Sequence, residues 1–202
     1  MSFRQEFKYR VTMAEYYQMK ENLKINGMKL LHNPRKVLSV YFDSADTIMF
    51  SDSEEGLLPR KKVRIRWYNK NNKFTLENKI SSIEGRFKTT RHLKNVDSIH
   101  KALRYQIVEQ EDGLLFPSLK VSYNRSYFSL AKMRITFDNE ITYHNLRLNS
   151  LIKYRDPECV IEIKVPEEIS SDFIQRIVPY PTARFSKYSR GLVLSQGRLS
   201  EY

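Results

Sequence analysis

Hydrophobic and charged residues alternate with a period of two over most of this chain, as in β-strands that have one apolar and one polar face. The clearest example is the segment CVIEIKV, where Glu162 and Lys164 share one face and Ile161 and Ile163 share the other. About seven or eight strands are predicted in this way, within residues 3–11, 37–43, 60–94 (three strands), 119–130, 134–141 and 159–165.

Capping residues and helical spacing predict a few helices between these strands. Thr12 begins a helix that runs to about Lys24, and Ser44 or Asp46 begins a short one. Asp97 caps a helix over 98–105, a further helix covers 169–178, and Ser186 caps a C-terminal helix at about 186–195. The polar segments 52–59 and 109–117 are predicted as loops.

The stretch 60–94 carries twelve Lys or Arg residues against two acids, although the whole chain has a formal net charge of only +12. Lys62, Arg64 and Arg66 fall on one face of the first strand, and an Asn-rich turn at 69–72 leads to the second. A solvated charged face is the plain interpretation. Repeated arginines without an intervening acid instead favour an anionic partner, because the guanidinium group binds phosphate oxygens in pairs.

Pairs of the form Glu-x-Lys occur three times, the last being Glu162 and Lys164. Carboxylates repel phosphate, so their presence among many cations has two interpretations. Each Glu can balance the neighbouring Lys and Arg, which we favour for Glu77, or it can hold a divalent cation that bridges to phosphate oxygens, which we favour for Glu162.

The length of 202 residues predicts one domain, residues 1–202, with its own core. The single cysteine, Cys159, excludes an internal disulfide and is predicted to be a buried small hydrophobe. The charged N-terminus and the lack of a long apolar run predict a cytoplasmic protein without an integral membrane segment.

Eight short motifs follow one another between about residues 3 and 190. In order, they are RQEFKY, SVYFDS, RIR, ENK, SYNR, RITFD, EIK and FSKY. With this series the chain resembles the polyphosphate polymerase domain of the vacuolar transporter chaperone (VTC) type, within the triphosphate tunnel (CYTH-like) superfamily. Asn78 departs from the family pattern, because it places an amide on the apolar side of its strand.

The resemblance implies an α+β fold in which an antiparallel β-barrel forms a tunnel with helices packed outside. It also implies a phosphotransferase that uses Mn2+ or Mg2+ and moves the γ-phosphate of ATP onto a growing polyphosphate chain, with pyrophosphate as a further ligand. The catalytic residues it implies are Arg64, Arg66, Lys8, Lys164 and Lys187. The substrate-binding residues are Lys79, Lys88, Arg91, Arg125 and Arg134, and the metal ligand is Glu162.

Two other functions remain open from the sequence. A tunnel triphosphatase would use the same residues to deliver water, but Arg4 stands where the hydrolase and cyclase branches have a first Glu, which favours the polymerase. The pI of about 9.7 and the interleaved aromatic residues are also compatible with a nucleic-acid binder. The Glu-x-Lys pairs fit that reading poorly, so we expect no specific nucleic-acid partner.

Overall fold

Antiparallel strands make up most of the computed structural model, which describes residues 4–68, 71–148, 151–166 and 169–197. The strands are β1 (Arg4–Val11), β2 (Lys29–Asp43), β3 (Arg60–Tyr68), β4 (Asn71–Ser82), β5 (Gly85–His92), β6 (Ile107–Glu109), β7 (Gly113–Leu130), β8 (Met133–Asn145), β9 (Tyr154–Arg155) and β10 (Cys159–Pro166). The helices are α1 (Met13–Ile25), α2 (Ile48–Glu55), α3 (Ile99–Leu103), α4 (Ser171–Ile177) and α5 (Lys187–Ser195).

The strands pair in the order β1-β10-β8-β7-β2-β3-β4-β5, with β6 paired to β7 and β9 to β8. Among the described residues, every pair whose register is defined is antiparallel, as between β1 and β10 or between β3 and β4. A tight turn at Ala131 and Lys132 joins β7 to β8. The fold is therefore of the predicted α+β, antiparallel class.

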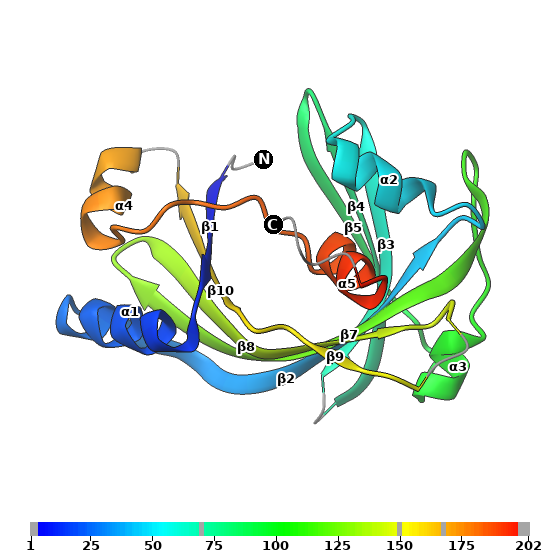
Figure 1. Cartoon of the computed structure of the whole chain (residues 1–202), viewed down its shortest axis with the longest axis horizontal. Coiled ribbons are helices and arrows are strands. Elements are labelled where there is room, and N and C mark those ends of the chain that lie inside the picture. Colours follow the sequence, from blue (N-terminus) through cyan, green and yellow to red (C-terminus); the bar gives the residue numbers. More distant parts are fainter. Residues whose placement is uncertain (1–3, 69–70, 149–150, 167–168, 198–202) are drawn as a thin grey trace. The chain divides into compact units, whose positions relative to one another are not determined.

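The chain divides into two compact units (Figure 1). Unit 1 comprises Met1–Lys36, Tyr123–Ile141 and Arg155–Phe185, and unit 2 comprises Val37–Ser122, Thr142–Tyr154 and Ser186–Tyr202. The long strands β2, β7 and β8 each contribute to both units. The assignment of residues 1–202 to one domain stays a prediction.

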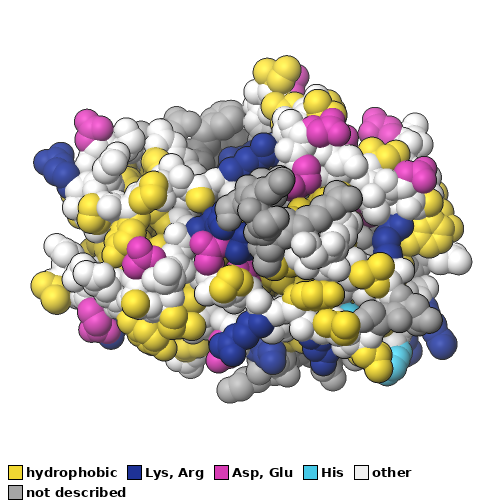
Figure 2. All heavy atoms as spheres, viewed as in Figure 1, with side chains coloured by type: hydrophobic (Ala, Val, Ile, Leu, Met, Phe, Trp, Pro, Cys, Tyr) yellow, Lys and Arg dark blue, Asp and Glu magenta, His cyan; other side chains and the backbone are white. Residues whose placement is uncertain are grey.

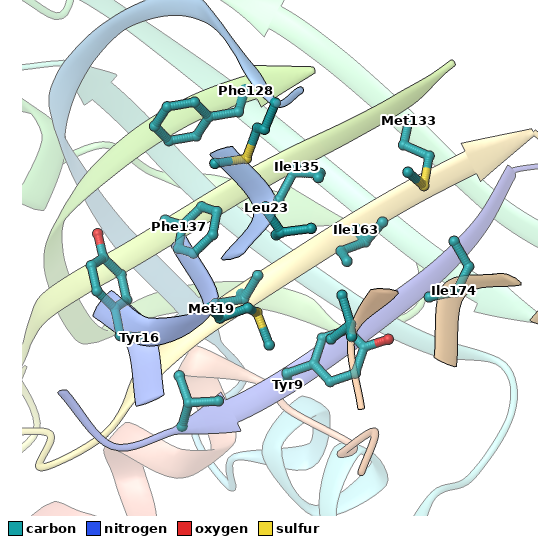
Figure 3. Packing of buried hydrophobic residues seen from close by; sticks show 14 of the residues in the cluster. Tyr9, Tyr16, Met19, Leu23, Phe128, Met133, Ile135, Phe137, Ile163 and Ile174 are labelled. Atoms are coloured by element: carbon teal, nitrogen blue, oxygen red, sulfur yellow. The ribbon is translucent and has the colours of Figure 1, made fainter. Parts of the chain in front are cut away.

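Helix α1 covers the apolar side of the strands in unit 1. It begins as predicted at Thr12, which forms a capping box with Glu15. Its buried face packs on β7, β8 and β10, and Tyr16 meets Phe137 edge to face with 5.3 Å between ring centroids. Figure 3 shows Met19 and Leu23 of the same helix among Ile135, Phe137 and Ile163. The apolar positions of the alternating strands thus form this core.

The core of unit 2 lies on the apolar side of β2, β3 and β4, where Val63, Ile65 and Trp67 are buried. Helix α5 is held close to the strands at Gly191. A Cβ atom there would lie 2.4 Å from Tyr143 Cδ1 and 2.6 Å from Leu119 Cδ2, so only glycine fits without a shift. This close approach fixes the helix that carries Lys187.

Several of the predicted strand boundaries are wrong. Strand β2 begins at Lys29 instead of residue 37, and ring contacts of His32 and Arg35 with Tyr127 accompany this exposed half. The predicted loop 109–117 contains the end of β6 and the start of β7, because Gly113 (φ 68°) closes a tight hairpin.

Two helix boundaries also differ from the prediction. Helix α2 continues through residues 52–55 of the predicted loop, and Gly56 ends it in the left-handed region. The cap of α3 is Ser98 and not Asp97, whose carboxylate instead accepts a hydrogen bond from Lys101 Nζ at 2.7 Å. The predicted strand start at Phe3 and the residues 69–70 of the Asn-rich turn lie outside the described residues.

Figure 2 shows Lys and Arg side chains interspersed with acidic and hydrophobic ones over the viewed face.

Within the described residues, none of the helices is both long enough and apolar enough to span a bilayer.

Candidate functional site

The polar face of β3, β4 and β5 in unit 2 carries cations in rows across the strands. The register places Lys62 opposite Lys79 and Lys79 opposite Lys88, so three lysines occupy one row across the strands. In the next row Arg64 lies opposite Glu77, and in the row beyond it Arg66 lies opposite Thr75. Like charges directly opposite each other destabilise a sheet, so this arrangement favours an anion that shields them.

Arg64 is nearly buried and is held by two neighbours. Its Nε and Nη2 contact Glu77 Oε2 at 2.7 Å and 2.5 Å, and its Nη1 donates to Tyr41 Oη at 2.8 Å. Glu77 also receives Lys88 Nζ at 2.6 Å and lies 3.5 Å from Arg66 Nη1. One carboxylate is therefore surrounded by three cations.

The electrostatics of Glu77 follow from this surrounding. Burial alone would raise the pKa of Glu77, but the charges of Arg64 and Arg66 and the hydrogen bond from Lys88 outweigh it. The pKa of Glu77 is thereby held well below its usual range, and the carboxylate stays ionised. The interpretation of Glu77 as a balancing charge fits this geometry, and the cluster keeps a net positive charge.

Helix α5 begins next to the same polar face. The N-cap residue Ser186 accepts a hydrogen bond from Lys62 Nζ at 2.7 Å, and its hydroxyl also receives Ser189 N–H of the first turn. Lys187 is the first residue of the helix. The predicted cap at Ser186 is confirmed, and Lys62 joins the group although the sequence reading did not select it.

Unit 1 carries a second charged cluster, in which two Glu-x-Lys pairs interlock. Glu6 pairs with Lys164 across β1 and β10, and Lys8 pairs with Glu162, so opposite charges face each other in both rows. Lys164 Nζ lies 3.1 Å from Glu162 and 3.5 Å from Glu6, and Lys8 Nζ lies 3.1 Å from Glu6. Antiparallel pairing of the two motifs thus places each Glu opposite a Lys of the neighbouring strand.

The two carboxylates are acidic despite their burial and their mutual repulsion. Burial raises the pKa of Glu162, but the charges of Lys164, Arg125 and Lys8 lower it by more. The pKa of Glu162 is therefore well below its usual range. Glu6 follows the same pattern, since burial and the charge of Glu162 raise its pKa while Lys8 and Lys164 lower it below the usual value.

Two further predicted phosphate ligands belong to unit 1. Arg125 forms a bidentate pair with Asp138, with Nε to Oδ1 and Nη2 to Oδ2 both at 2.6 Å. Asp138 is fully buried, so this pair is part of the protein's own structure. Arg134 is an exposed residue of β8 and lies opposite Lys164 of β10.

A divalent cation fits the carboxylates of unit 1 only as a site with few protein ligands. In the described part of the chain, no group of three or more His, Cys, Asp or Glu is placed to hold a metal ion. Glu6 and Glu162 nevertheless both contact Lys164, and the buried hydroxyl of Thr136, opposite Glu162, has no hydrogen-bond partner. Mg2+ and Mn2+ accept such sites when water and substrate phosphates complete the coordination.

The structure thus brings the predicted residues together in two groups. Arg64, Arg66, Lys79 and Lys88 share the polar face in unit 2, and Lys8, Lys164, Glu162, Arg125 and Arg134 lie in unit 1. Arg91 is separate from the first group, because it lies opposite Leu76 on the apolar side and donates to Tyr105 Oη at 3.2 Å. Asn78 lies on that side too and donates to Glu109.

Comparison with solved structures supports the fold. PH1012 from Pyrococcus horikoshii OT3 has a TM-score of 0.59 and 12% sequence identity over 92% of this chain and 98% of its own. A proposed adenylate cyclase from Bacillus halodurans has a TM-score of 0.58 and 14% sequence identity over 91% of this chain and 95% of its own. HpAC1 from Hippeastrum is described as a proposed adenylyl cyclase with a dominant triphosphatase activity. It has a TM-score of 0.51 and 12% sequence identity over 98% of each chain. The predicted fold class is confirmed by these likenesses.

No curated protein sequence matches this chain. The profile of the VTC domain, in contrast, matches residues 3–195, which is nearly the full length. The motifs, the strand order and this match agree, and the chain belongs to the VTC domain family.

Proposed function

We propose that this protein is a metal-dependent phosphotransferase, a polyphosphate polymerase that transfers the γ-phosphate of ATP to polyphosphate. The observation that carries the proposal is the row of Lys62, Lys79 and Lys88 beside Arg64 and Arg66 on one face of unit 2. Such a face attracts a linear anion with several charges. Membership of the VTC domain family supports the same assignment.

The chemistry requires mainly binding, orientation and charge neutralisation. Phosphoryl transfer passes through a transition state whose charge is spread over several oxygens, so fixed cations stabilise it without a covalent step. Arg64 and Arg66 would clamp neighbouring phosphates, and Lys79 and Lys88 would bind further ones along the row. Lys187 would contribute a further charge from the start of α5.

Within unit 1 itself we propose a metal site and further phosphate-binding residues. Glu162, with Glu6 beside it, would hold Mn2+ or Mg2+, which when bound neutralises charge on phosphate oxygens. Lys8, Lys164 and Arg134 would neutralise additional phosphate charge. Arg125 is already paired with Asp138, so we assign it the role of holding this polar face in shape.

The proposal is tested by product analysis. The purified protein is incubated with ATP and Mn2+, with and without pyrophosphate, and the products are resolved on a gel stained for polyphosphate while ADP is quantified. A ladder of long chains with equivalent ADP is expected. The Arg64→Ala, Arg66→Ala double variant and Glu162→Gln should each abolish it.

A matched control removes the same charge elsewhere. Lys24 and Lys101 are exposed and pair with Glu21 and Asp97, so the Lys24→Ala, Lys101→Ala double variant should retain the ladder. A ladder that persists in the arginine variant would contradict the assignment of this face.

A tunnel triphosphatase is the second candidate, because HpAC1 shares the fold and has a dominant triphosphatase activity. It predicts release of inorganic phosphate without chains in the same assay. If neither chains nor phosphate appear, and ATP fails to raise the melting temperature, the phosphotransferase proposal is wrong. A non-enzymatic nucleic-acid or polyanion binder would then be the leading assignment.

A further inference from the structure

Tyr41 lies between Arg64 and the C-terminal helix in unit 2. Its hydroxyl accepts the hydrogen bond from Arg64 Nη1 at 2.8 Å, and its ring stacks on that of Tyr188 with 5.1 Å between centroids and 16° between planes. Both tyrosines are buried. Tyr41 lies within the motif SVYFDS, but neither the alternation of residues nor the family resemblance gave it a role.

Glu77 contacts the Arg64 guanidinium on the side that carries Nε and Nη2. Its two contacts, from Nε and Nη2, converge on a single atom, Glu77 Oε2. Two contacts to one oxygen restrain the tilt of a planar group less than contacts to two separate acceptors do. The bond from Nη1 to Tyr41 is at the other end of the guanidinium and adds a restraint at a second point.

The Tyr41 ring is itself held by a fixed neighbour. Tyr188 Oη donates to Asp43 Oδ2 at 2.5 Å and lies 3.1 Å from Ser118 Oγ. Asp43 is fully buried and also accepts the backbone N–H groups of Met49 and Phe50 at the start of α2. Burial and the charge of Asp43 raise the pKa of the Tyr188 phenol, so it remains a donor.

We propose that Tyr41 is a positioning residue that orients the Arg64 guanidinium for binding phosphate. The inference rests on the proposed function, because it deepens the role given there to Arg64. Tyr41 acts through Arg64 and needs no contact with substrate of its own. Preorganisation of this kind lowers the ordering cost of binding, and a hydrogen bond to a charged group is worth about a tenfold change in affinity or more.

The test removes only the hydroxyl, with Tyr41→Phe. Inorganic tripolyphosphate without metal is titrated into the full-length protein by calorimetry, with Tyr17→Phe as the control, since Tyr17 is an exposed tyrosine of α1 in unit 1. We expect about tenfold weaker binding for Tyr41→Phe and less than twofold change for Tyr17→Phe. The melting temperature reports whether each variant is folded.

A double-variant cycle separates positioning from a merely structural role. Arg64→Lys keeps a cation next to Glu77 but lacks the planar guanidinium group that Tyr41 is proposed to orient. In that background Tyr41→Phe should change tripolyphosphate affinity by less than twofold. Equal losses in both backgrounds would overturn the proposal.

A readout without ligand distinguishes failure of this inference from failure of the proposed function. In protein labelled with 15N-arginine, the Arg64 side-chain signals are assigned by their loss in Arg64→Lys. Restricted rotation of the Arg64 Nη groups is expected in the wild type and faster rotation in Tyr41→Phe. With that difference present, a wild type that fails to bind tripolyphosphate rejects the proposed function alone. Unchanged rotation together with unchanged affinity rejects the positioning role.

Discussion

Removing the charge of Glu77 is the most informative single perturbation of unit 2. Glu77→Gln keeps the size and one acceptor oxygen but leaves Arg64, Arg66 and Lys88 around a neutral group. Breaking a buried ion pair by removing one partner costs about 3 kcal/mol or more. For a chain of 202 residues this corresponds to a melting temperature lower by about 7 °C.

The pH dependence provides a second quantity from the same variant. The pKa of Glu77 is lowered in the folded protein, so its contribution to stability is fully present above the unfolded pKa of about 4.3 and is lost as pH falls. Between pH 7 and pH 3 the unfolded wild type takes up a proton at this residue while the folded protein does not. The stability difference between wild type and Glu77→Gln should therefore be about 1.8 kcal/mol smaller at pH 3.

Urea denaturation at both pH values, followed by circular dichroism, measures these differences. Glu111→Gln is the matched control, because the Glu111 side chain is 85% exposed and lies 3.7 Å from Lys61. It should change stability by less than about 0.5 kcal/mol. If Glu77→Gln is as stable as Glu111→Gln at pH 7, the carboxylate does not hold these cations and the reasoning is refuted.

Three further predictions concern the elements that position the site. Asp43→Asn should cost about 2–3 kcal/mol in urea unfolding, because a buried charged acceptor for α2 and Tyr188 is lost, and a cost below about 0.5 kcal/mol would contradict the network. Gly191→Ala should lower stability by about 1–3 kcal/mol despite the better helix propensity of alanine, since its Cβ would meet Tyr143, and a higher melting temperature would disprove this close packing. Thr12→Ala should cost about 1 kcal/mol by thermal unfolding through loss of the α1 capping box, and an unchanged transition would count against that box.

The alternation of residues predicted the polar and apolar faces well, because side-chain direction in a strand depends only on parity. It placed Arg64 and Arg66 on one face and Ile65 on the other, as the structure does. The composition around the Glu-x-Lys pairs led us to favour Glu77 as a balancing charge, which fits its three cationic neighbours. The family resemblance grouped Arg91 with Lys88 as phosphate ligands, whereas in the structure Arg91 lies opposite Leu76 and Lys88 opposite Lys79.

The partners across strands could not be predicted in the same way, because they depend on register. Register decides that Lys62, Lys79 and Lys88 form one row and that Glu6 faces Lys164. A shift by one residue would reverse each face. Only the turns and the core packing set that register, and neither is evident from alternation alone.

Contacts between residues far apart in the sequence could not be predicted either. Tyr41 is an aromatic residue in an apolar strand, and only the fold brings Tyr188, 147 positions later in the sequence, against its ring. Asp43 caps α2 from outside the helix, where the sequence suggested Ser44 or Asp46 as the cap. Ser44 does contribute, since its hydroxyl accepts the N–H of Ile48 at 3.0 Å.

We propose that the charged face of unit 2 is a phosphate-binding surface. Calorimetric titration of tripolyphosphate into the wild type, the Arg64→Ala, Arg66→Ala variant and the Lys24→Ala, Lys101→Ala variant tests it most directly, because both variants lose the same charge. We expect saturable binding to the wild type and the lysine variant and at least a hundredfold weaker binding to the arginine variant. Equal affinity in all three proteins, or weakening that follows net charge alone, would contradict it.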